Sequence, residues 1–494
     1  MLFAELLKEI GAEAVVRDFK PDLDIAGIAY DSRKVAPGFI FVAIPGSKVD
    51  GHNYIAQAVE KGAVAIFCER EVEIADGVAV VRVPDCRLAL AALSAGFYGH
   101  PDQKLRLIGV TGTNGKTTVT NLIKWLLDQK GYKTGLIGTI CNMAGDKKLP
   151  ADHTTPESLE LFQLLKTMAD ENCRYVVMEV SSHALSQGRV SACHYAAAVF
   201  TNLTQDHLDY HGSMGAYLQS KIKLFRMLDP MDGENRYGVV NINDKAGSSF
   251  IEHCKAPVIT YGSDEDGITL RLLYYTPSER GTKFALTYNG QLYRAEMPLI
   301  GKFNVYNALA AMAVAIQEGL TVEECIQALA KAPQVPGRFE LVDEGQNFDV
   351  VVDYAHTPDG LKNLLSAARK LKPRRLITVF GCGGNRDKGK RPIMGHIAGS
   401  FSDVVIITSD NPRYEDPNDI ITQVEVGVME VDNNYLVEAN RERAIALAIN
   451  MAENGDMVVI AGKGHEDYQI IGNQTIHFDD REVARQQLRL KLGK

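Results

Sequence analysis

Residues 111–118 have the sequence Thr-Gly-Thr-Asn-Gly-Lys-Thr-Thr, and the rest of the chain can be placed relative to this stretch. The apolar run at 105–110 predicts a buried strand before it, and the apolar spacing of 119–127 predicts a helix after it. Glycines at such a turn let backbone N–H groups close around phosphate oxygens, while Lys116 adds a cation and Thr117 can ligate Mg²⁺. The stretch therefore predicts a nucleoside triphosphate site.

One position departs from the general phosphate-loop pattern. Val110 stands where that pattern has its first glycine, five positions before Gly115. A glycine-rich turn with an ordinary surface lysine is the alternative interpretation. Two glycines, a lysine and two threonines between a clear strand and a clear helix favour the phosphate site.

Composition excludes several classes of function. The net charge is −9 and no basic run stands out, which argues against nucleic-acid partners and acidic membrane surfaces. The eight cysteines include no C-x-x-C pair, which argues against a zinc site and a disulfide framework. No apolar run reaches the ~20 residues that a membrane span needs. We therefore expect a cytoplasmic, monomeric protein that acts on small molecules.

Alternating strands and helices predict an α/β fold with three domains, which fits a chain of 494 residues. Residues 1–98 predict a small α/β N-terminal domain, and 99–335 predict a doubly wound, nucleotide-binding P-loop domain. Pro333 and Pro336 mark the next boundary, and 336–494 predict a Rossmann-like C-terminal domain. In the central domain we expect strands near residues 105–110, 136–140, 175–180, 196–200 and 237–241.

Polar side chains follow two of these strands. Glu179 ends an apolar strand, where a carboxylate is costly to bury unless it is paired or bound to a cation, so it favours Mg²⁺. An edge strand with a solvated glutamate is the alternative. Two histidines and two aspartates then fall within residues 206–211, but Mg²⁺ prefers oxygen ligands, so a solvated loop is a fair alternative there. Spacing alone makes Lys221 and Lys223 surface cations of a helix.

Other polar segments leave their roles open. The turns at 31–33 and 45–52 fit ordinary turn chemistry. Asn304 and Asn307, at the start of an alanine-rich helix, suit either helix caps or contacts with a nucleotide base.

Four polar, glycine-rich loops follow strands of the C-terminal domain and predict a ligand crevice. Two of them carry Arg386 and Arg413. A guanidinium pairs bidentately with a carboxylate, so two arginines in one crevice suggest a substrate that bears carboxylates. Each arginine alone is better explained as a solvated surface residue. The loops occupy residues 353–358, 381–388, 409–413 and 462–466.

Together these motifs resemble the Mur ligase family, the ATP-dependent amide-forming enzymes of bacterial peptidoglycan precursor synthesis. The resemblance covers essentially the whole chain, and the motifs match best the branch that adds the third peptide residue. Asp410-Asn411-Pro412-Arg413 looks like the version that uses meso-diaminopimelate rather than L-lysine, because Arg413 would pair with the additional carboxylate. The stretches that carry the resemblance, in the family's order, are TGTNGKTT, MEVSSHAL, TNLTQDHLDYHG, GKFNVYNALAA, VPGRFE, VDYAHTPDGL and GCGGNRDKGKRP.

The resemblance implies that ATP and Mg²⁺ bind in the central domain. Lys221 would be carbamylated by CO₂, which turns a cation into an oxygen ligand for a second Mg²⁺. The catalytic residues would be Lys116, Lys221, Glu179 and His207. The metal ligands would be Thr117, Glu179, His207 and Lys221. The ATP-binding residues would be Gly112, Thr113, Asn114, Gly115, Lys116, Thr117, Thr118, Asn304, Arg338 and Asp353.

It also implies two further substrates, with the N-terminal domain binding the UDP-sugar and the C-terminal domain the amino acid. The UDP-N-acetylmuramoyl-dipeptide would be held by Ser32, Ser47, Lys48, Val49, Thr154, Thr155, Ser181, Gln187 and Arg189. Diaminopimelate would be held by Arg386, Asp410, Asn411, Pro412, Arg413, Gly462 and Glu466.

The implied reaction has two steps. The γ-phosphate of ATP would pass to the D-glutamyl γ-carboxylate, and the amine of diaminopimelate would then attack the acyl phosphate. Alternatives are the same step with L-lysine, another Mur or folylpolyglutamate-type ligase, and a regulatory protein with a degenerate site. The presence of Lys116, Glu179, His207 and Lys221 argues against the last of these.

Overall fold

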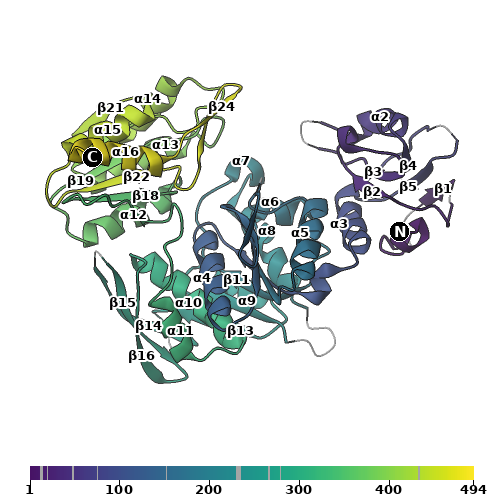
Figure 1. Ribbon diagram of the computed structural model, residues 1–494, viewed down its shortest axis with the longest axis horizontal. Helices are drawn as coiled ribbons and strands as arrows, with labels where there is room; N and C mark the ends of the chain where they lie inside the picture. Colours follow the sequence, from purple (N-terminus) through teal and green to yellow (C-terminus); the bar gives the residue numbers. More distant parts are fainter. Residues whose placement is uncertain are drawn as a thin grey trace.

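The computed structural model describes residues 1–11, 15–18, 20–46, 49–74, 76–151, 153–229, 235–264, 267–278, 280–431 and 434–494. Three large sheets, each with its own helices, follow one another along the described part of the chain (Figure 1). We call them the N-terminal, central and C-terminal units. The predicted α/β class with parallel sheets is confirmed.

The N-terminal unit has a five-stranded sheet of order β1-β5-β4-β3-β2. β1 pairs antiparallel with β5, and the other pairs are parallel. Its strands are β1 (Val15–Arg17), β2 (Gly27–Ala29), β3 (Phe39–Val42), β4 (Ala63–Cys68) and β5 (Ala79–Arg82). Its helices are α1 (Phe3–Leu7), α2 (Ile55–Glu60) and α3 (Cys86–Phe97), with 3₁₀ turns η1 (Ser32–Lys34), η2 (Gly51–Tyr54) and, towards the central unit, η3 (Pro101–Lys104).

The central unit has an eleven-stranded sheet of order β16-β15-β14-β13-β12-β11-β6-β10-β7-β8-β9. The seven neighbouring strands β14-β13-β12-β11-β6-β10-β7 pair in parallel. At one edge β15 and β16 continue the sheet with antiparallel pairs, and at the other edge β8 and β9 do the same. The strands are β6 (Arg106–Thr111), β7 (Thr134–Ile137), β8 (Asn142–Ala144), β9 (Lys147–Leu149), β10 (Tyr175–Glu179), β11 (Tyr195–Phe200), β12 (Tyr237–Asn241), β13 (Val258–Gly262), β14 (Leu270–Ser278), β15 (Gly281–Tyr288) and β16 (Gln291–Met297).

Apolar residues on both faces hold this sheet. Along β10, Val177 packs into the core under α4 and α10, whereas Val176 and Met178 pack into the core under α5 and α8. The alanines of α10 are buried, and their small side chains let this helix pack closely on α4 (Figure 1). The helices are α4 (Lys116–Gln129), α5 (Ser158–Asp170), α6 (Ser182–Ser186), α7 (Leu208–His211), α8 (Met214–Arg226), α9 (Gly247–Glu252), α10 (Lys302–Gln317) and α11 (Val322–Leu329).

One predicted strand needs correction. The strand expected at 136–140 is β7, which spans Thr134–Ile137. It stops early because the backbone N–H of Thr139 donates to the Glu179 carboxylate, 2.9 Å away, instead of to a neighbouring strand. The other four predicted strands lie within one residue of β6, β10, β11 and β12.

The C-terminal unit has a six-stranded sheet of order β17-β18-β22-β19-β20-β21 and a separate hairpin, β23–β24. The strands are β17 (Glu340–Leu341), β18 (Asp349–Asp353), β19 (Leu376–Phe380), β20 (Val404–Ile407), β21 (Tyr435–Val437), β22 (Met457–Ala461), β23 (Tyr468–Ile471) and β24 (Gln474–His477). The helices are α12 (Pro358–Lys370), α13 (Lys390–Phe401), α14 (Pro417–Met429), α15 (Arg441–Met451) and α16 (Asp480–Leu492).

The N-terminal and C-terminal units lie on opposite sides of the central unit (Figure 1). On one side α3 packs on α5, and the hydroxyl of Tyr30 donates to Glu160 at 2.9 Å. On the other side Phe303 of α10 packs against the core of the C-terminal unit. Among the described residues, no helix combines the length and the apolar character that crossing a membrane would require.

Candidate active site

The phosphate loop lies between β6 and α4, as predicted, and two of its glycines are sterically required. Gly112 has φ +145°, and a Cβ there would lie 1.9 Å from Oγ1 of Thr201. Gly115 has φ +87°, and a Cβ there would lie 2.5 Å from Oδ1 of Asn307. The loop is fixed from the β11 side, since the backbone N–H of Asn114 donates to Oδ1 of Asn202 at 2.9 Å. The loop backbone is therefore held in place against the segment that follows β11.

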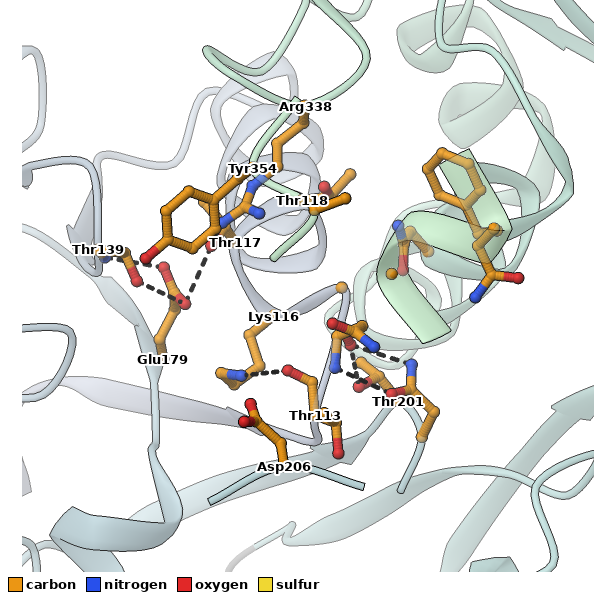
Figure 2. Close-up of a pocket in the computed structure, with 18 of the residues that line it drawn as sticks. Thr113, Lys116, Thr117, Thr118, Thr139, Glu179, Thr201, Asp206, Arg338 and Tyr354 are labelled. Atoms are coloured by element: carbon orange, nitrogen blue, oxygen red, sulfur yellow. Dashed lines mark hydrogen bonds between the residues drawn. The ribbon is translucent and has the colours of Figure 1, made fainter. Parts of the chain in front are cut away.

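A cavity of about 340 Å³ lies over this loop, between the central and C-terminal units (Figure 2). The central unit contributes Lys116, Thr117 and Glu179, and the C-terminal unit contributes Arg338 and Tyr354. The ATP-binding residues predicted from the sequence that line it are Thr113, Asn114, Gly115, Lys116, Thr117, Thr118, Arg338 and Asp353.

The other two predicted nucleotide residues support the cavity from behind. Gly112 is the first glycine of the loop and is packed against Thr201 and Asn202. Asn304 is buried, donates to the carbonyl of Ile300 at 2.9 Å and accepts a hydrogen bond from Asn307 at 3.1 Å. Asn307 itself lines the cavity. The structure thus places Asn307, rather than Asn304, in the position to contact a ligand.

Glu179 is buried at the end of β10, a central strand between β6 and β7. The solvated edge-strand alternative is therefore wrong. One carboxylate oxygen accepts hydrogen bonds from the hydroxyls of Thr117 and Thr139, both at 3.1 Å (Figure 2). Thr117 and Glu179 thus present oxygen atoms to the cavity side by side.

Lys116 is the first residue of α4, and its ammonium folds back onto the loop. Nζ donates to the carbonyls of Gly112, at 3.0 Å, and Thr113, at 2.8 Å. Burial lowers the pKa of Lys116, and the nearby Glu179 opposes that shift. Asp206 lies beside the loop, on the side where the Lys116 side chain lies (Figure 2). The ammonium is thus held over the loop backbone, ready for an anionic ligand.

Lys221 does not lie on the helix surface, as spacing alone had suggested. Only 1% of the residue is exposed, and Nζ donates to the carbonyl of Gly112 at 2.7 Å. The ammonium also lies over the ring of Tyr217, 4.5 Å from its centre. Burial lowers the pKa of Lys221 well below its ordinary value, and the neighbouring Lys116 adds to the shift. α8 turns this residue inwards because it packs against the sheet on that face.

His207 lines the cavity and has φ +53°, at the start of α7. Its Nε2 lies 3.3 Å from the Asp206 carboxylate, and its ring meets that of His183 edge to face at 4.8 Å. Desolvation lowers the pKa of His207 to about 4, against the opposing effect of Asp206. The imidazole is therefore neutral at pH 7.

The residues predicted to bind the UDP-substrate fall into two places. Thr154 and Ser181 line the cavity. Thr155, Gln187 and Arg189 lie next to them, since Arg189 donates to the carbonyl of Thr155 at 3.0 Å and to the Gln187 side-chain oxygen.

The remaining members of this group belong to the N-terminal unit. Ser32 is buried and donates to Oε1 of Gln57 at 2.6 Å, and Val49 is exposed. In the described residues the cavity wall includes no member of the N-terminal unit, so the structure does not bring these two residues to the cavity. Ser47 and Lys48 lie outside the described residues.

The residues predicted to bind diaminopimelate gather at one edge of the C-terminal sheet. Asn411 donates to Glu466 at 2.9 Å, and a Cβ on Gly462 would lie 2.8 Å from the Asp410 carboxylate. Arg413 is half-buried and donates to the carbonyl of Gly384 at 2.9 Å. The other two members are Pro412, which is buried in the same loop, and Arg386, which is exposed on the neighbouring one.

Tyr354 connects this edge to the cavity. Its ring lines the cavity and lies under the Arg338 guanidinium, 4.6 Å from the ring centre. Its hydroxyl donates to Glu466 at 3.4 Å. The predicted amino-acid residues therefore adjoin the predicted nucleotide residues.

Sequence reasoning missed several residues that complete the site. Thr139 follows β7 and donates to Glu179, and Asp359 of α12 accepts from Asn114 at 3.0 Å. Lys463 is fully buried, and its ammonium donates to Glu466 at 2.9 Å. Lys463 lies inside a predicted loop and could have been found there. Thr139 and Asp359 have no local signal, because their partners lie 40 and 245 residues away.

A phosphate loop in a doubly wound unit, with a cavity closed by a second α/β unit, defines an enzyme that uses a nucleoside triphosphate. Three family models match the chain. Their descriptions are "Mur ligase family, catalytic domain" for residues 24–98, "Mur ligase middle domain" for 110–315, and "Mur ligase, glutamate ligase domain" for 337–464. The chain belongs to the Mur ligase family, whose members are ATP-dependent ligases that form amide bonds.

Similar proteins extend over the whole chain. A protein of Syntrophomonas wolfei, named UDP-N-acetylmuramoyl-L-alanyl-D-glutamate–2,6-diaminopimelate ligase, is 46% identical and covers 100% of both chains. A protein of the same name from Geobacillus thermodenitrificans is 49% identical over 94% of both. A solved structure of a ligase of that name has a TM-score of 0.70 and 32% identity, covering 100% of this chain and 99% of the other. A ligase from Thermotoga maritima in complex with ADP, at 19% identity and a TM-score of 0.64, shares the fold.

Proposed function

We propose that this chain forms the amide bond between meso-diaminopimelate and the D-glutamyl γ-carboxylate of UDP-N-acetylmuramoyl-L-alanyl-D-glutamate. The reaction uses ATP and belongs to peptidoglycan precursor synthesis. The observation that carries the proposal is that the Arg413 loop adjoins the nucleotide cavity, through Glu466 and Tyr354. Relatives that extend over the whole chain carry the name of this enzyme, which supports the substrate assignment.

The proposed domains are 1–98 for the UDP-sugar, 99–335 for ATP and 336–494 for the amino acid. The three sheets and the three family-model matches support this division. The monomeric state and the cytoplasmic location stay predictions of the sequence.

ATP would lie in the cavity with its phosphates on the loop. The N-terminus of α4 follows the loop, so its backbone N–H groups would bind a phosphate, and Lys116 would exchange its carbonyl partners for phosphate oxygens. Both groups would offset negative charge that develops during phosphoryl transfer. Transfer of the γ-phosphate to the D-glutamyl γ-carboxylate would give an acyl phosphate, whose carbonyl carbon an amine can attack with release of phosphate.

The chemistry of the wall also fits Mg²⁺. Thr117 and Glu179 offer hard oxygen ligands on one side of the cavity, 3.1 Å apart. In the described part of the chain no three His, Cys, Asp or Glu side chains form a metal-binding group, so phosphate oxygens would complete the coordination. Bound Mg²⁺ would supply positive charge to the transferring phosphoryl group. His207 is a further proposed ligand, since its neutral ring lines the same cavity.

Carbamylation of Lys221 is part of the proposal. CO₂ reacts with the neutral form of an amine. Burial lowers the pKa of Lys221 and so favours that neutral form. The carbamate would place oxygen atoms under the phosphate loop, where Nζ now contacts the carbonyl of Gly112. A second Mg²⁺ would take one of these oxygens as a ligand.

The acceptor amino acid would bind at the edge of the C-terminal sheet. Arg413 would pair with the carboxylate that diaminopimelate has and lysine lacks. Glu466 and Asp410 are the carboxylates at this edge that would pair with an ammonium group of the substrate. With lysine the half-buried guanidinium would remain unpaired, which disfavours that substrate by about 1–3 kcal/mol or more.

The test is phosphate release from ATP with the UDP-linked dipeptide and a panel of amino acids. We expect release only when both the dipeptide and an amino acid are present, with diaminopimelate at least tenfold better than L-lysine. Equal or better turnover with lysine would contradict the acceptor assignment. Turnover with a folate and glutamate, instead of the UDP-substrate, would reassign the chain to folylpolyglutamate synthesis.

A further inference from the structure

Arg386 and Arg413 belong to two loops that lie directly against each other. A Cβ on Gly383 would lie 3.0 Å from Nη1 of Arg413 and 3.9 Å from Cγ of Arg386. Burial lowers the pKa of Arg413, and the like charge of the nearby Arg386 adds to this shift. The carboxylates of Asp410 and Glu466 oppose this effect on Arg413.

The backbones of these loops are in contact. A Cβ on Gly384 would lie 1.9 Å from the carbonyl oxygen of Pro412, so only glycine allows this approach. The N–H of Gly384 donates to the carbonyl of Asn411 at 2.9 Å, and the N–H of Tyr414 donates to Oδ1 of Asn385 at 3.1 Å. Asn385 and Arg413 have φ +52° and +54°, which side-chain-bearing residues rarely adopt. Strained backbone of this kind persists only where its surroundings fix it.

Glu415 lies where the two loops join. Its carboxylate accepts the backbone N–H of Asn385, which is the residue before Arg386. It also accepts two parallel hydrogen bonds from Arg391, at 2.9 and 3.0 Å, and lies 3.4 Å from the Lys388 ammonium. Hydrogen bonding to Arg391 lowers the pKa of Glu415 to about 2, so the carboxylate is ionised at pH 7.

Arg391 anchors this carboxylate to the fold. Its side chain is fully buried at the start of α13, and its guanidinium also donates to the carbonyl of Gly383 at 3.3 Å and to Gln423 of α14 at 3.0 Å. Neither Glu415 nor Arg391 lines the cavity. Their hydrogen bonds reach the backbone of Gly383 and Asn385, in the loop that carries Arg386.

We propose that the Glu415–Arg391 ion pair is a positioning pair for amino-acid selectivity, holding Arg386 and Arg413 together so that both can face one substrate carboxylate. The inference rests on the proposed function, since it deepens the account of the same site. Glu415 joins the loop that carries Arg413 to the loop that carries Arg386, and Arg391 ties the Glu415 carboxylate to the two helices behind these loops. A ligand carboxylate then meets a preformed, doubly cationic recess.

The test measures kcat/KM for diaminopimelate and for L-lysine, in wild type and in Glu415→Gln. We expect the variant to lose at least tenfold in kcat/KM for diaminopimelate, mainly through KM, while the value for lysine changes less than threefold. The KM values for ATP and the UDP-substrate should stay unchanged. Asp419→Asn is the matched control, because it removes an exposed carboxylate from the same segment.

Two further variants keep the outcome decisive. Arg391→Lys keeps the positive charge but loses the two parallel hydrogen bonds to Glu415. Glu415→Asp keeps the negative charge but shortens the side chain by one methylene. Both should reduce the diaminopimelate-to-lysine ratio, and the double variant Arg391→Lys/Glu415→Gln should lose little more than Glu415→Gln alone.

Equal losses for both amino acids would show a merely structural role and overturn the inference, as would an unchanged ratio. A wild-type enzyme without diaminopimelate-dependent turnover would instead contradict the proposed function itself.

Discussion

Nη2 of Arg338 donates to Oγ1 of Thr117 at 2.9 Å, so the C-terminal unit contacts the phosphate loop directly. The same guanidinium lies over the ring of Tyr354, whose hydroxyl reaches Glu466. One side chain thus joins the nucleotide cavity to the amino-acid edge.

Replacement of Arg338 should weaken nucleotide binding. Hydrogen bonds from a charged donor contribute about 1.5–3 kcal/mol, so Arg338→Ala should raise the KM for ATP by roughly 10- to 100-fold. Initial rates at varied ATP measure this. Lys362→Ala removes an exposed cation from α12 and should leave that KM unchanged. An unaltered KM in the Arg338 variant would exclude a nucleotide contact.

Lys221→Ala should abolish synthesis. It removes the group that we propose carries the carbamate, and short-chain carboxylic acids should restore part of the activity by supplying an oxygen ligand in the vacated space. Lys223→Ala, an exposed lysine two positions along the same helix, should retain full activity. Amide formation is the measurement. Full activity of Lys221→Ala would remove carbamylation from the mechanism.

Glu179→Gln should lower kcat by about 10²–10³, a typical loss for a group that stabilises transition-state charge. The amide keeps the shape of the side chain, so the circular dichroism spectrum should not change. Rates measured over a Mg²⁺ titration should show a higher half-saturating concentration. Glu252→Gln on the exposed face of α9 provides the control. An unchanged Mg²⁺ dependence would argue against Glu179 as a ligand.

Arg413→Ala should lower the preference for diaminopimelate over L-lysine by roughly 10- to 100-fold, because the variant loses the ion pair with the additional carboxylate of diaminopimelate. Arg413→Lys should restore only part of it, since an ammonium cannot bind a carboxylate through a planar fork. Competition between the two amino acids, with product analysis, measures the ratio. Arg443→Ala, at an exposed position of α15, should behave as wild type. Retained preference in Arg413→Ala would assign the discrimination elsewhere.

The Arg441–Asp480 pair should be essential for stability. Both side chains are fully buried, and Nη2 of Arg441 lies 2.7 Å from Oδ2 of Asp480. Asp480→Asn leaves an uncompensated buried charge and should lower the free energy of unfolding by about 3–5 kcal/mol. Urea denaturation followed by fluorescence measures it. Asp467→Asn, which is exposed, should change stability by less than about 0.5 kcal/mol. If Asp480→Asn also changed the free energy of unfolding by less than about 0.5 kcal/mol, the pair would contribute little to stability.

Much of the central sheet could be predicted from the sequence, because strands buried on both faces appear as continuous apolar runs. Residues 175–180 and 196–200 are examples, and they match β10 and β11 within one residue. The antiparallel ribbon β14–β16 gave no such signal. It lies at the edge of the sheet and exposes Tyr274 and Leu292, so its apolar residues do not form one continuous run.

The sequence by itself determined the chemistry of the phosphate loop, because glycines, a lysine and a threonine at fixed spacing act through the backbone of a few adjacent residues. The motifs likewise determined the family. Only the tertiary structure decided that Lys221 is buried under Gly112, that Glu179 belongs to a central strand, and that Arg338 reaches Thr117 from another unit. These facts depend on segments up to 221 residues apart, and burial and pairing at that separation are fixed by packing rather than by local sequence.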